Sequence, residues 1–196
     1  AYLDVFAVVP PDECYNPEHP VTRTECLRYR GLAFDVIRSR GGVVSSEEPA
    51  DWAVPHLDLV HHGPYALDPN PGSGPAVGIP IPLFDLVYHD AIVLPWSLGK
   101  GPWGIPETDL GFLHGLGHAG LPYLGLDPSE QELDRVRMMC ALNARVGLLE
   151  MTRHEFLGGS YRNQRFSYAD GTTVTIDLDS GAYDIAPKVD VPAWIR

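Results

Sequence analysis

The sequence predicts an α/β fold, namely the C-terminal half of a (β/α)8 TIM-type barrel followed by an antiparallel β segment. Short apolar segments alternate with helical patterns up to about residue 150, which is typical of parallel strands joined by helical crossovers. Only about four or five such strands occur, too few for an eight-stranded barrel. The chain also begins with a strand-like segment, so we expect it to start inside a longer protein. An open doubly wound sheet is the alternative.

The first elements follow from local patterns. Residues 1–9 are apolar and β-rich and predict a strand buried on both faces. Thr22 and Thr24 are candidate caps for a helix over about 22–39. Residues 43–47 and 57–61 predict the next two strands. This order gives a β-α-β unit followed directly by a third strand.

The middle of the chain continues the alternation. Residues 64–82 are rich in Pro and Gly and predict a long surface loop. A strand is expected at 91–96, a helix from Pro106 to about Ala119, and a short strand at 121–124. A Ser-Glu start signal predicts the longest helix over about 129–149.

The pattern changes from residue 151 onward. Residues 165–168 and 172–178 alternate apolar and polar side chains around an Asp-Gly turn, which predicts a β-hairpin. We therefore expect a partial catalytic barrel over residues 1–150 and the start of a β-sandwich-like domain over 151–196.

Composition limits the classes of function. The net charge is −12, with 14 Lys and Arg against 26 Asp and Glu, which argues against a nucleic-acid partner. No apolar run is long enough to span a bilayer, so no membrane partner is expected. No G-x-G-x-x-G loop follows the first strand, and no cofactor is predicted. The sequence leaves the cellular location open, a secreted or periplasmic parent included.

Two carboxylates stand where neighbouring strands end. Asp4 lies within the first apolar segment, and Glu47 ends the second, next to Glu48. Consecutive parallel strands place such side chains side by side at the carboxyl edge of the sheet. That geometry can hold two carboxyl groups roughly 5 to 5.5 Å apart, the separation of a retaining glycosidase. The competing interpretation is that Asp4 caps a loop or pairs with an arginine, and that Glu47 and Glu48 lie in a solvated loop.

Four short motifs, in this order, resemble bacterial glycoside hydrolases related to the endo-α-N-acetylgalactosaminidases. They are Tyr2-Leu3-Asp4-Val5, Val44-Ser45-Ser46-Glu47, the segment Pro82-Leu83-Phe84-Asp85-Leu86-Val87-Tyr88-His89-Asp90, and Glu150-Met151-Thr152-Arg153-His154-Glu155-Phe156-Leu157. The resemblance implies a (β/α)8 catalytic barrel followed by β-sandwich material. It also implies retaining hydrolysis of α-linked sugars.

The resemblance assigns the nucleophile to Asp4 and the acid/base to Glu47, with Glu48 as the other match for the glutamate. The partner is then a carbohydrate substrate. The first barrel strands are missing, so part of the sugar site is expected from the N-terminal half of the same parent chain. We expect the isolated 196 residues to be inactive.

Further residues near strand ends and loops are candidates for sugar binding. Aromatic rings stack on the apolar faces of sugars, and imidazoles and carboxylates bond to sugar hydroxyls. Trp96, at a strand end, is the preferred stacking platform, although core or rim packing competes with this role for every aromatic residue. The predicted substrate-binding residues are Tyr2, Glu48, Trp52, His61, His62, Tyr88, His89, Asp90 and Trp96.

Two other functions compete with the glycosidase. A metal-dependent hydrolase would use Asp4, His61, His89 and Asp90. His114 and His118 stand one helical turn apart, but they lie on a predicted crossover helix without the HExxH glutamate, so no metal is predicted there. A non-catalytic carbohydrate-binding or structural fragment is the third alternative.

Overall fold

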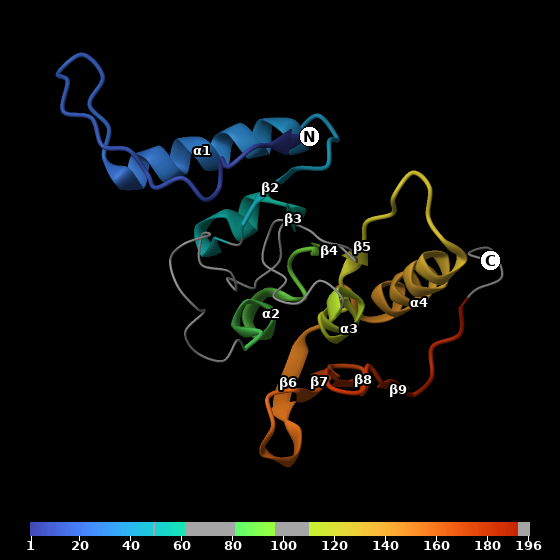
Figure 1. Ribbon diagram of the computed structural model, residues 1–196. Coiled ribbons are helices and arrows are strands. Elements are labelled where there is room, and N and C mark those ends of the chain that lie inside the picture. Colours follow the sequence, from blue (N-terminus) through green and yellow to red (C-terminus); the bar gives the residue numbers. More distant parts are fainter. Residues whose placement is uncertain (49, 62–80, 97–109, 192–196) are drawn as a thin grey trace, which may run out of the picture. The chain divides into compact units, whose positions relative to one another are not determined.

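The computed structural model describes residues 1–48, 50–61, 81–96 and 110–191. The chain divides into two compact units, Ala1–His61 and His62–Arg196, and each is described by itself (Figure 1). Within the described residues, none of the helices has the length and apolar character that crossing a bilayer requires.

The first unit is a three-stranded parallel sheet with one long helix. Its order is β1-β2-β3. Its elements are β1 (Tyr2–Leu3), α1 (Arg23–Arg38), β2 (Ser45–Glu47), the 3-10 helix η1 (Asp51–His56) and β3 (Leu59–His61). Both strand pairs are parallel, as the β-α-β pattern predicts.

Local signals fix both ends of α1. Thr22 is the N-cap and forms a capping box with Glu25, which satisfies free backbone donors of the first turn. The helix ends before Gly41, which has a φ of 76°. The amide of Gly42 donates to the carbonyl of Ile37 at 3.2 Å. The predicted helix is therefore confirmed to within one residue at each end.

The predicted strand over residues 1–9 is wrong beyond Leu3. The chain turns after β1, and the amides of Val8 and Val9 both donate to the carbonyl of Val5, at 3.2 and 3.1 Å. These local bonds replace strand pairing, so Asp4 is exposed at the strand end instead of being buried inside the strand.

The second unit combines a short parallel sheet with a four-stranded antiparallel sheet, in the orders β4-β5 and β6-β7-β8-β9. Its elements are α2 (Leu83–Tyr88), β4 (Pro95–Trp96), α3 (Gly111–Gly117), β5 (Leu121–Pro122), α4 (Glu130–Val146), β6 (Met151–Phe156), the 3-10 helix η3 (Leu157–Gly159), β7 (Asn163–Tyr168), β8 (Thr173–Asp177) and β9 (Tyr183–Ala186).

The sequence predictions for this unit hold in most places. The longest helix and the hairpin of β7 and β8 are confirmed, but the predicted strand over 91–96 shortens to β4, after a helix α2 that was not predicted. Pro106 lies outside the described residues. The predicted domain boundary at residue 150 stays a prediction.

The core of the second unit lies between α3, α4 and the antiparallel sheet. Glycines allow α3 to approach closely, because a Cβ on Gly117 would overlap the ring of Phe166 on β7. The hydroxyl of Tyr168 donates to the carbonyl of Gly117 at 2.6 Å. The fold is thus a mixed α/β structure with parallel and antiparallel sheets, as the sequence predicts.

Candidate active site

The ends of β1, β2 and β3 bring three predicted site residues into one row. Leu3 pairs with Ser46 and Ser46 with Val60. One position further along, Glu47 pairs with His61, and Asp4 directly follows Leu3 on the other side of Glu47. The carboxyl ends of parallel strands are where active sites form in barrels and open sheets.

One tyrosine hydroxyl joins the two carboxylates. The Oη atom of Tyr2 lies 3.2 Å from Oδ1 of Asp4 and within hydrogen-bond distance of Oε1 of Glu47. The other oxygen of Glu47 accepts from the backbone amide of Val5 at 3.1 Å. Asp4 and Glu47 therefore converge on one point at the same edge of the sheet, as the sequence predicts.

The electrostatics of this cluster are dominated by negative charge. The pKa of Tyr2 is raised well above its usual value, first by partial removal from water and then by the carboxylates of Glu47 and Asp4. The hydroxyl therefore keeps its proton near neutral pH and acts as a hydrogen-bond donor to the pair.

The turn that carries Asp4 is held by side chains of the neighbouring elements. The hydroxyl of Ser46 accepts from the amide of Ala7 at 3.1 Å and donates to the carbonyl of Leu3 at 2.7 Å. The indole nitrogen of Trp52 donates to the carbonyl of Ala7 at 3.1 Å. These bonds fix the turn from two sides, so the position of Asp4 depends on β2 and η1.

Backbone strain directly follows each candidate carboxylate. Val5 has a φ of 44° and Glu48 a φ of 54°, in a region that side-chain-bearing residues rarely adopt and that is least favourable for β-branched ones. Such positions cost about 1 to 3 kcal/mol each and tend to occur at functional sites. The strained residue Val5 also donates its backbone amide to Oε2 of Glu47 at 3.1 Å.

The structure distinguishes Glu47 from Glu48. Glu47 contacts Tyr2 and Val5 through both of its oxygens. Glu48 is half-buried, and its backbone amide donates to the carbonyl of His61 at 3.0 Å. The geometry therefore favours Glu47 as the partner of Asp4.

Two further predicted site residues adjoin this cluster. The ring of His61 lies edge-to-face against Tyr2, with centroids 5.1 Å apart. Trp52 packs on Phe34 at 6.3 Å and holds the turn through Ala7. His61 thus contacts the tyrosine that bridges the two carboxylates, whereas the indole nitrogen of Trp52 bonds to the backbone of the turn.

Sequence reasoning missed the supporting residues of this site. The hydroxyl of Ser46 is buried in a short strand, and a serine at an inward-facing strand position is the signal that marks a specific backbone partner. The contribution of the Val5 amide could not be read from the sequence, because it depends on a turn inside an apolar run.

The preference for Trp96 as a stacking platform is not supported by its burial. Trp96 is 2% exposed, its indole nitrogen donates to the carbonyl of Gly111 at 2.9 Å, and its ring stacks on His118 at 4.9 Å. His118 covers a face of the ring, and Gly115 on α3 approaches the indole so closely that a Cβ there would overlap it. In the second unit Trp96 is a core residue.

The other predicted residues of the second unit differ in exposure. His89 is buried, and its ring nitrogens lie 2.7 and 3.0 Å from the carbonyls of Leu149 and His118, which does not favour a sugar contact. Tyr88 packs against Phe84 at 5.2 Å, and Asp90 is exposed. For all three, sugar binding stays a prediction. His62 lies outside the described residues.

A buried histidine–aspartate pair was not predicted from the sequence. Nδ1 of His118, at the end of α3, is hydrogen-bonded to Oδ2 of Asp85 on α2, and both side chains are fully buried. Burying a carboxylate requires such a partner. The pair links α2 to the turn before β5. Among the described residues, no group of three or more His, Cys, Asp and Glu is arranged to hold a metal ion.

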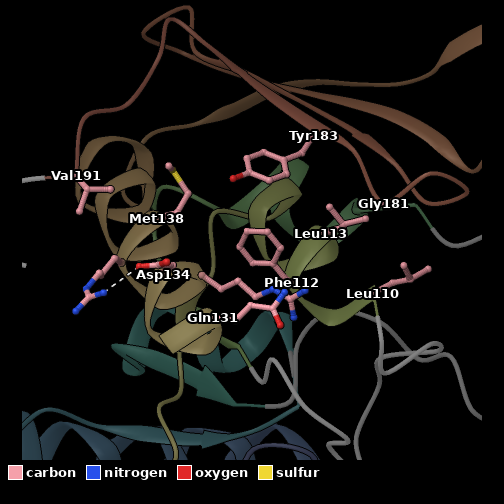
Figure 2. Close-up of a pocket in the computed structure, with 11 residues that line it drawn as sticks. Leu110, Phe112, Leu113, Gln131, Asp134, Met138, Gly181, Tyr183 and Val191 are labelled. Carbon is pink, nitrogen blue, oxygen red and sulfur yellow. Dashed lines mark hydrogen bonds and ion pairs between the residues drawn. The ribbon is translucent and has the colours of Figure 1, made fainter. Parts of the chain in front are cut away.

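The second unit also contains a hollow of about 740 Å³ between α3, α4 and β9 (Figure 2). The ring of Tyr183 meets Phe112 edge-on, with centroids 5.4 Å apart. The guanidinium carbon of Arg135 lies 5.3 Å from the centroid of the Phe112 ring. None of the predicted site residues lines this hollow.

The chain is similar to solved structures of one enzyme. No protein-family model and no curated protein matches the sequence. Solved structures do match. The ligand-free alpha-N-acetylgalactosaminidase NagBb from Bifidobacterium bifidum matches with a TM-score of 0.82 and 39% identity, over 94% of this chain and 30% of that chain.

Two further structures of NagBb give the same result. A quadruple mutant matches with a TM-score of 0.83 and 39% identity, over 95% of this chain and 30% of that chain. The complex of NagBb with GalNAc matches with a TM-score of 0.80 and 37% identity, over 94% of this chain and 30% of that chain. The chain thus spans less than a third of the structures it matches. Over nearly all of its own length it is related to one part of an α-N-acetylgalactosaminidase, a glycoside hydrolase, as its motifs indicate.

Proposed function

We propose that this chain carries the catalytic carboxylates of a retaining glycoside hydrolase that acts on α-linked sugars, with Asp4 as nucleophile and Glu47 as acid/base. One observation carries the proposal: the hydroxyl of Tyr2 is bonded to both carboxylates at the ends of adjacent parallel strands.

The spacing of the two groups supports a retaining mechanism. Because both carboxylates bond to one hydroxyl oxygen, their nearest oxygens are at most about 6 Å apart. Retaining enzymes hold their carboxyl groups about 5 to 5.5 Å apart, whereas inverting enzymes need about 6.5 to 9.5 Å to admit a water molecule. The pair therefore suits direct attack on the anomeric carbon.

The environments of the two residues support their separate roles. Asp4 is exposed in the turn after β1, where a carboxylate oxygen can reach a sugar. Glu47 is half-buried, and its side chain is held by Tyr2 and the Val5 amide. A positioned carboxyl group that first gives and later takes a proton is what the acid/base role requires.

The comparisons support a substrate class. NagBb is named for its action on α-linked N-acetylgalactosamine and has a structure with GalNAc bound. We propose a terminal α-linked N-acetylhexosamine as the substrate. We also propose that the parallel strands β1–β5 form part of a (β/α)8 barrel, since parallel strands alternate here with helices. We assign this activity to the longer polypeptide of which these 196 residues are a part.

The test is a pair of isosteric variants with matched controls. Asp4→Asn and Glu47→Gln remove one charge each and keep the shape. We expect each to lower kcat/KM on an unactivated α-N-acetylgalactosaminide by roughly 10² to 10⁴. Asp12→Asn removes a charge from the same unit outside the pair and should retain activity within a few-fold of wild type. Glu48→Gln tests the other candidate for the glutamate and should lower kcat/KM less than Glu47→Gln.

Azide separates the two roles. With Glu47→Gln, azide attacks the glycosyl-enzyme and should give an α-glycosyl azide, with net retention. With Asp4 replaced by Gly, azide attacks the substrate directly and should give the β-glycosyl azide. Full activity of both isosteric variants, or loss in Glu48→Gln in place of Glu47→Gln, would refute the assignment.

A further inference from the structure

A thiol, an imidazole and an amide meet in the loop between β1 and α1. Sγ of Cys14 lies 3.3 Å from Nδ1 of His19, and Nδ2 of Asn16 lies 2.9 Å from Nε2 of the same ring. Asn16 and His19 are exposed, and Cys14 is half-buried. An imidazole that contacts a nucleophile and is itself oriented by a third group is a typical arrangement around a reactive cysteine. The cluster has no role in the proposed function.

The orientation of the Asn16 amide is fixed by its other end. Oδ1 of Asn16 accepts from the backbone amide of Glu18 at 3.0 Å. The reversed amide would turn an N–H group toward the N–H of Glu18 and would lose this bond. Nδ2 is therefore the group that faces His19. Because an amide nitrogen only donates, Nε2 of His19 is the acceptor.

The acceptor role of Nε2 determines the tautomer of His19. A neutral imidazole has one N–H group and one lone pair. With the lone pair at Nε2, the proton is at Nδ1, the nitrogen that faces Sγ of Cys14. The sulfur is thus the hydrogen-bond acceptor. In this arrangement the imidazole does not take the thiol proton at Nδ1, as the general base of a cysteine hydrolase would.

The bond donated to sulfur favours the nucleophilic form of Cys14. A thiol sulfur is a weak acceptor, whereas a hydrogen bond to the charged form of a group stabilises that form. The thiolate is the form that attacks electrophiles. The backbone also holds the sulfur in place, because Cys14 and Val21 exchange two backbone hydrogen bonds, at 2.8 and 2.9 Å.

We propose that Cys14 is a modification site that undergoes thiol–disulfide exchange with small disulfides, with His19 as a positioning residue. The Cys14 thiol releases its proton to water, and its sulfur anion attacks one sulfur of the disulfide R–S–S–R. A new S–S bond forms between Cys14 and R–S, and the original S–S bond breaks. The second half leaves as R–S⁻ and takes a proton from water. Cys14 is oxidised and the leaving half is reduced, so electrons and protons balance.

The other two cysteines of the chain serve as internal references. Cys26 on α1 and Cys140 on α4 are free thiols and are half-buried, as Cys14 is. Burial raises the pKa of the Cys140 thiol, so its reactive anion is less populated. Because all three thiols meet the same reagent in the same solution, differences between their rates report on the surroundings of each sulfur.

The first measurement is the rate at which oxidised glutathione modifies each cysteine of the longer polypeptide, followed by peptide mass spectrometry. We expect Cys14 to react at least about threefold faster than Cys26 and Cys140, because a stabilised anion gains more in population than it loses in nucleophilicity. In urea this preference should disappear. A folded protein in which Cys14 reacts no faster than Cys26 would overturn the inference. A preference that persists in urea would also overturn it, because it would come from the local sequence alone.

Variants of His19 test its positioning role. His19→Phe keeps a flat ring without the N–H donor and should lower the rate at Cys14 to that of Cys26. His19→Asn places an amide N–H near the position of Nδ1 and should restore part of the rate. Tyr15→Phe is the matched control, because Tyr15 is the exposed neighbour of Cys14 and its hydroxyl bonds to Glu13; its rate should equal that of wild type. An unchanged rate in His19→Phe would refute the role of the imidazole.

Nitrogen NMR of the His19 ring tests the tautomer without any reaction. At about pH 8, where ordinary imidazoles are neutral, we expect the ring proton at Nδ1. Asn16→Leu removes the amide donor that fixes this tautomer and should move the proton toward Nε2 in part of the molecules. A wild-type ring with its proton at Nε2 would overturn the inference, because His19 would then accept from the Cys14 thiol.

Discussion

Acid should weaken the second unit through one buried histidine. His114 on α3 is 3% exposed, and burial, with smaller contributions from the charges of His118 and Arg162, lowers its pKa from 6.5 to about 4. Between these two values the unfolded chain binds a proton at this imidazole and the folded unit does not. Stability is therefore fully present above about pH 6.5 and is lost as the pH falls toward 4.

The size of the effect follows from the shift. A difference of about 2.5 pH units corresponds to about 3 kcal/mol when the loss is complete. At about pH 5 the loss should be about 2 kcal/mol, a large share of the stability of a small domain. The pKa of His154 is also lowered, chiefly by burial, and adds to the same trend.

The assay is urea unfolding at about pH 8 and about pH 5, followed through the amide NMR signals of β7 and β8, which report on the second unit. His114→Gln removes the titrating ring and should reduce the acid-induced loss by about 2 kcal/mol, leaving the part due to His154. His19→Gln, in an exposed loop of the first unit, is the control. An acid-induced loss that agrees within about 0.5 kcal/mol between wild type and His114→Gln would refute the reasoning.

Three further substitutions test the packing, the capping and the strain. Gly117→Ala places a methyl group against the ring of Phe166, which is fully buried. The variant should lower the free energy of unfolding by about 1 to 3 kcal/mol in urea titrations. An unchanged urea midpoint would show that the core accommodates the methyl group without loss of stability. Ser129→Ala removes the N-cap of α4 and should cost about 1 kcal/mol, with Ser129→Asp near wild type; equal stability of all three would exclude the cap. Asparagine tolerates the φ of 44° at position 5 with less strain than valine. Val5→Asn should therefore raise the free energy of unfolding by about 1 kcal/mol. A lower free energy of unfolding than wild type would contradict this explanation.

The candidate site was predictable where its residues obey the geometry of parallel strands. Asp4 and Glu47 could be paired in advance, because consecutive parallel strands end at one edge of a sheet. Their exposure could not, because the apolar run that contains Asp4 predicts a longer strand than forms. The turn at Val5 depends on Ser46 and Trp52, which lie about forty residues or more away in the sequence.

The burial of Trp96 could likewise not be predicted from the local sequence. A tryptophan at a strand end is equally compatible with an exposed platform and with a core residue. The stacking of His118 and the close approach of α3 decide for the core, and both come from a helix that follows Trp96 in the chain. The hydrogen bond between His118 and Asp85 also joins two elements, and no local sequence pattern predicts that they are in contact.

The sequence by itself determined the elements whose signals act within a few residues: the two capped helices, the Asp-Gly hairpin and the alternation of strands with helices. These depend on backbone bonds between near neighbours, which Thr22, Ser129 and Gly171 supply locally. Only the tertiary structure decided that Tyr2 bridges two carboxylates, that β1 ends at Leu3 and that Trp96 is buried. Each of these depends on contacts between segments distant in the chain, whose free energy is realised only when the sheets and helices pack.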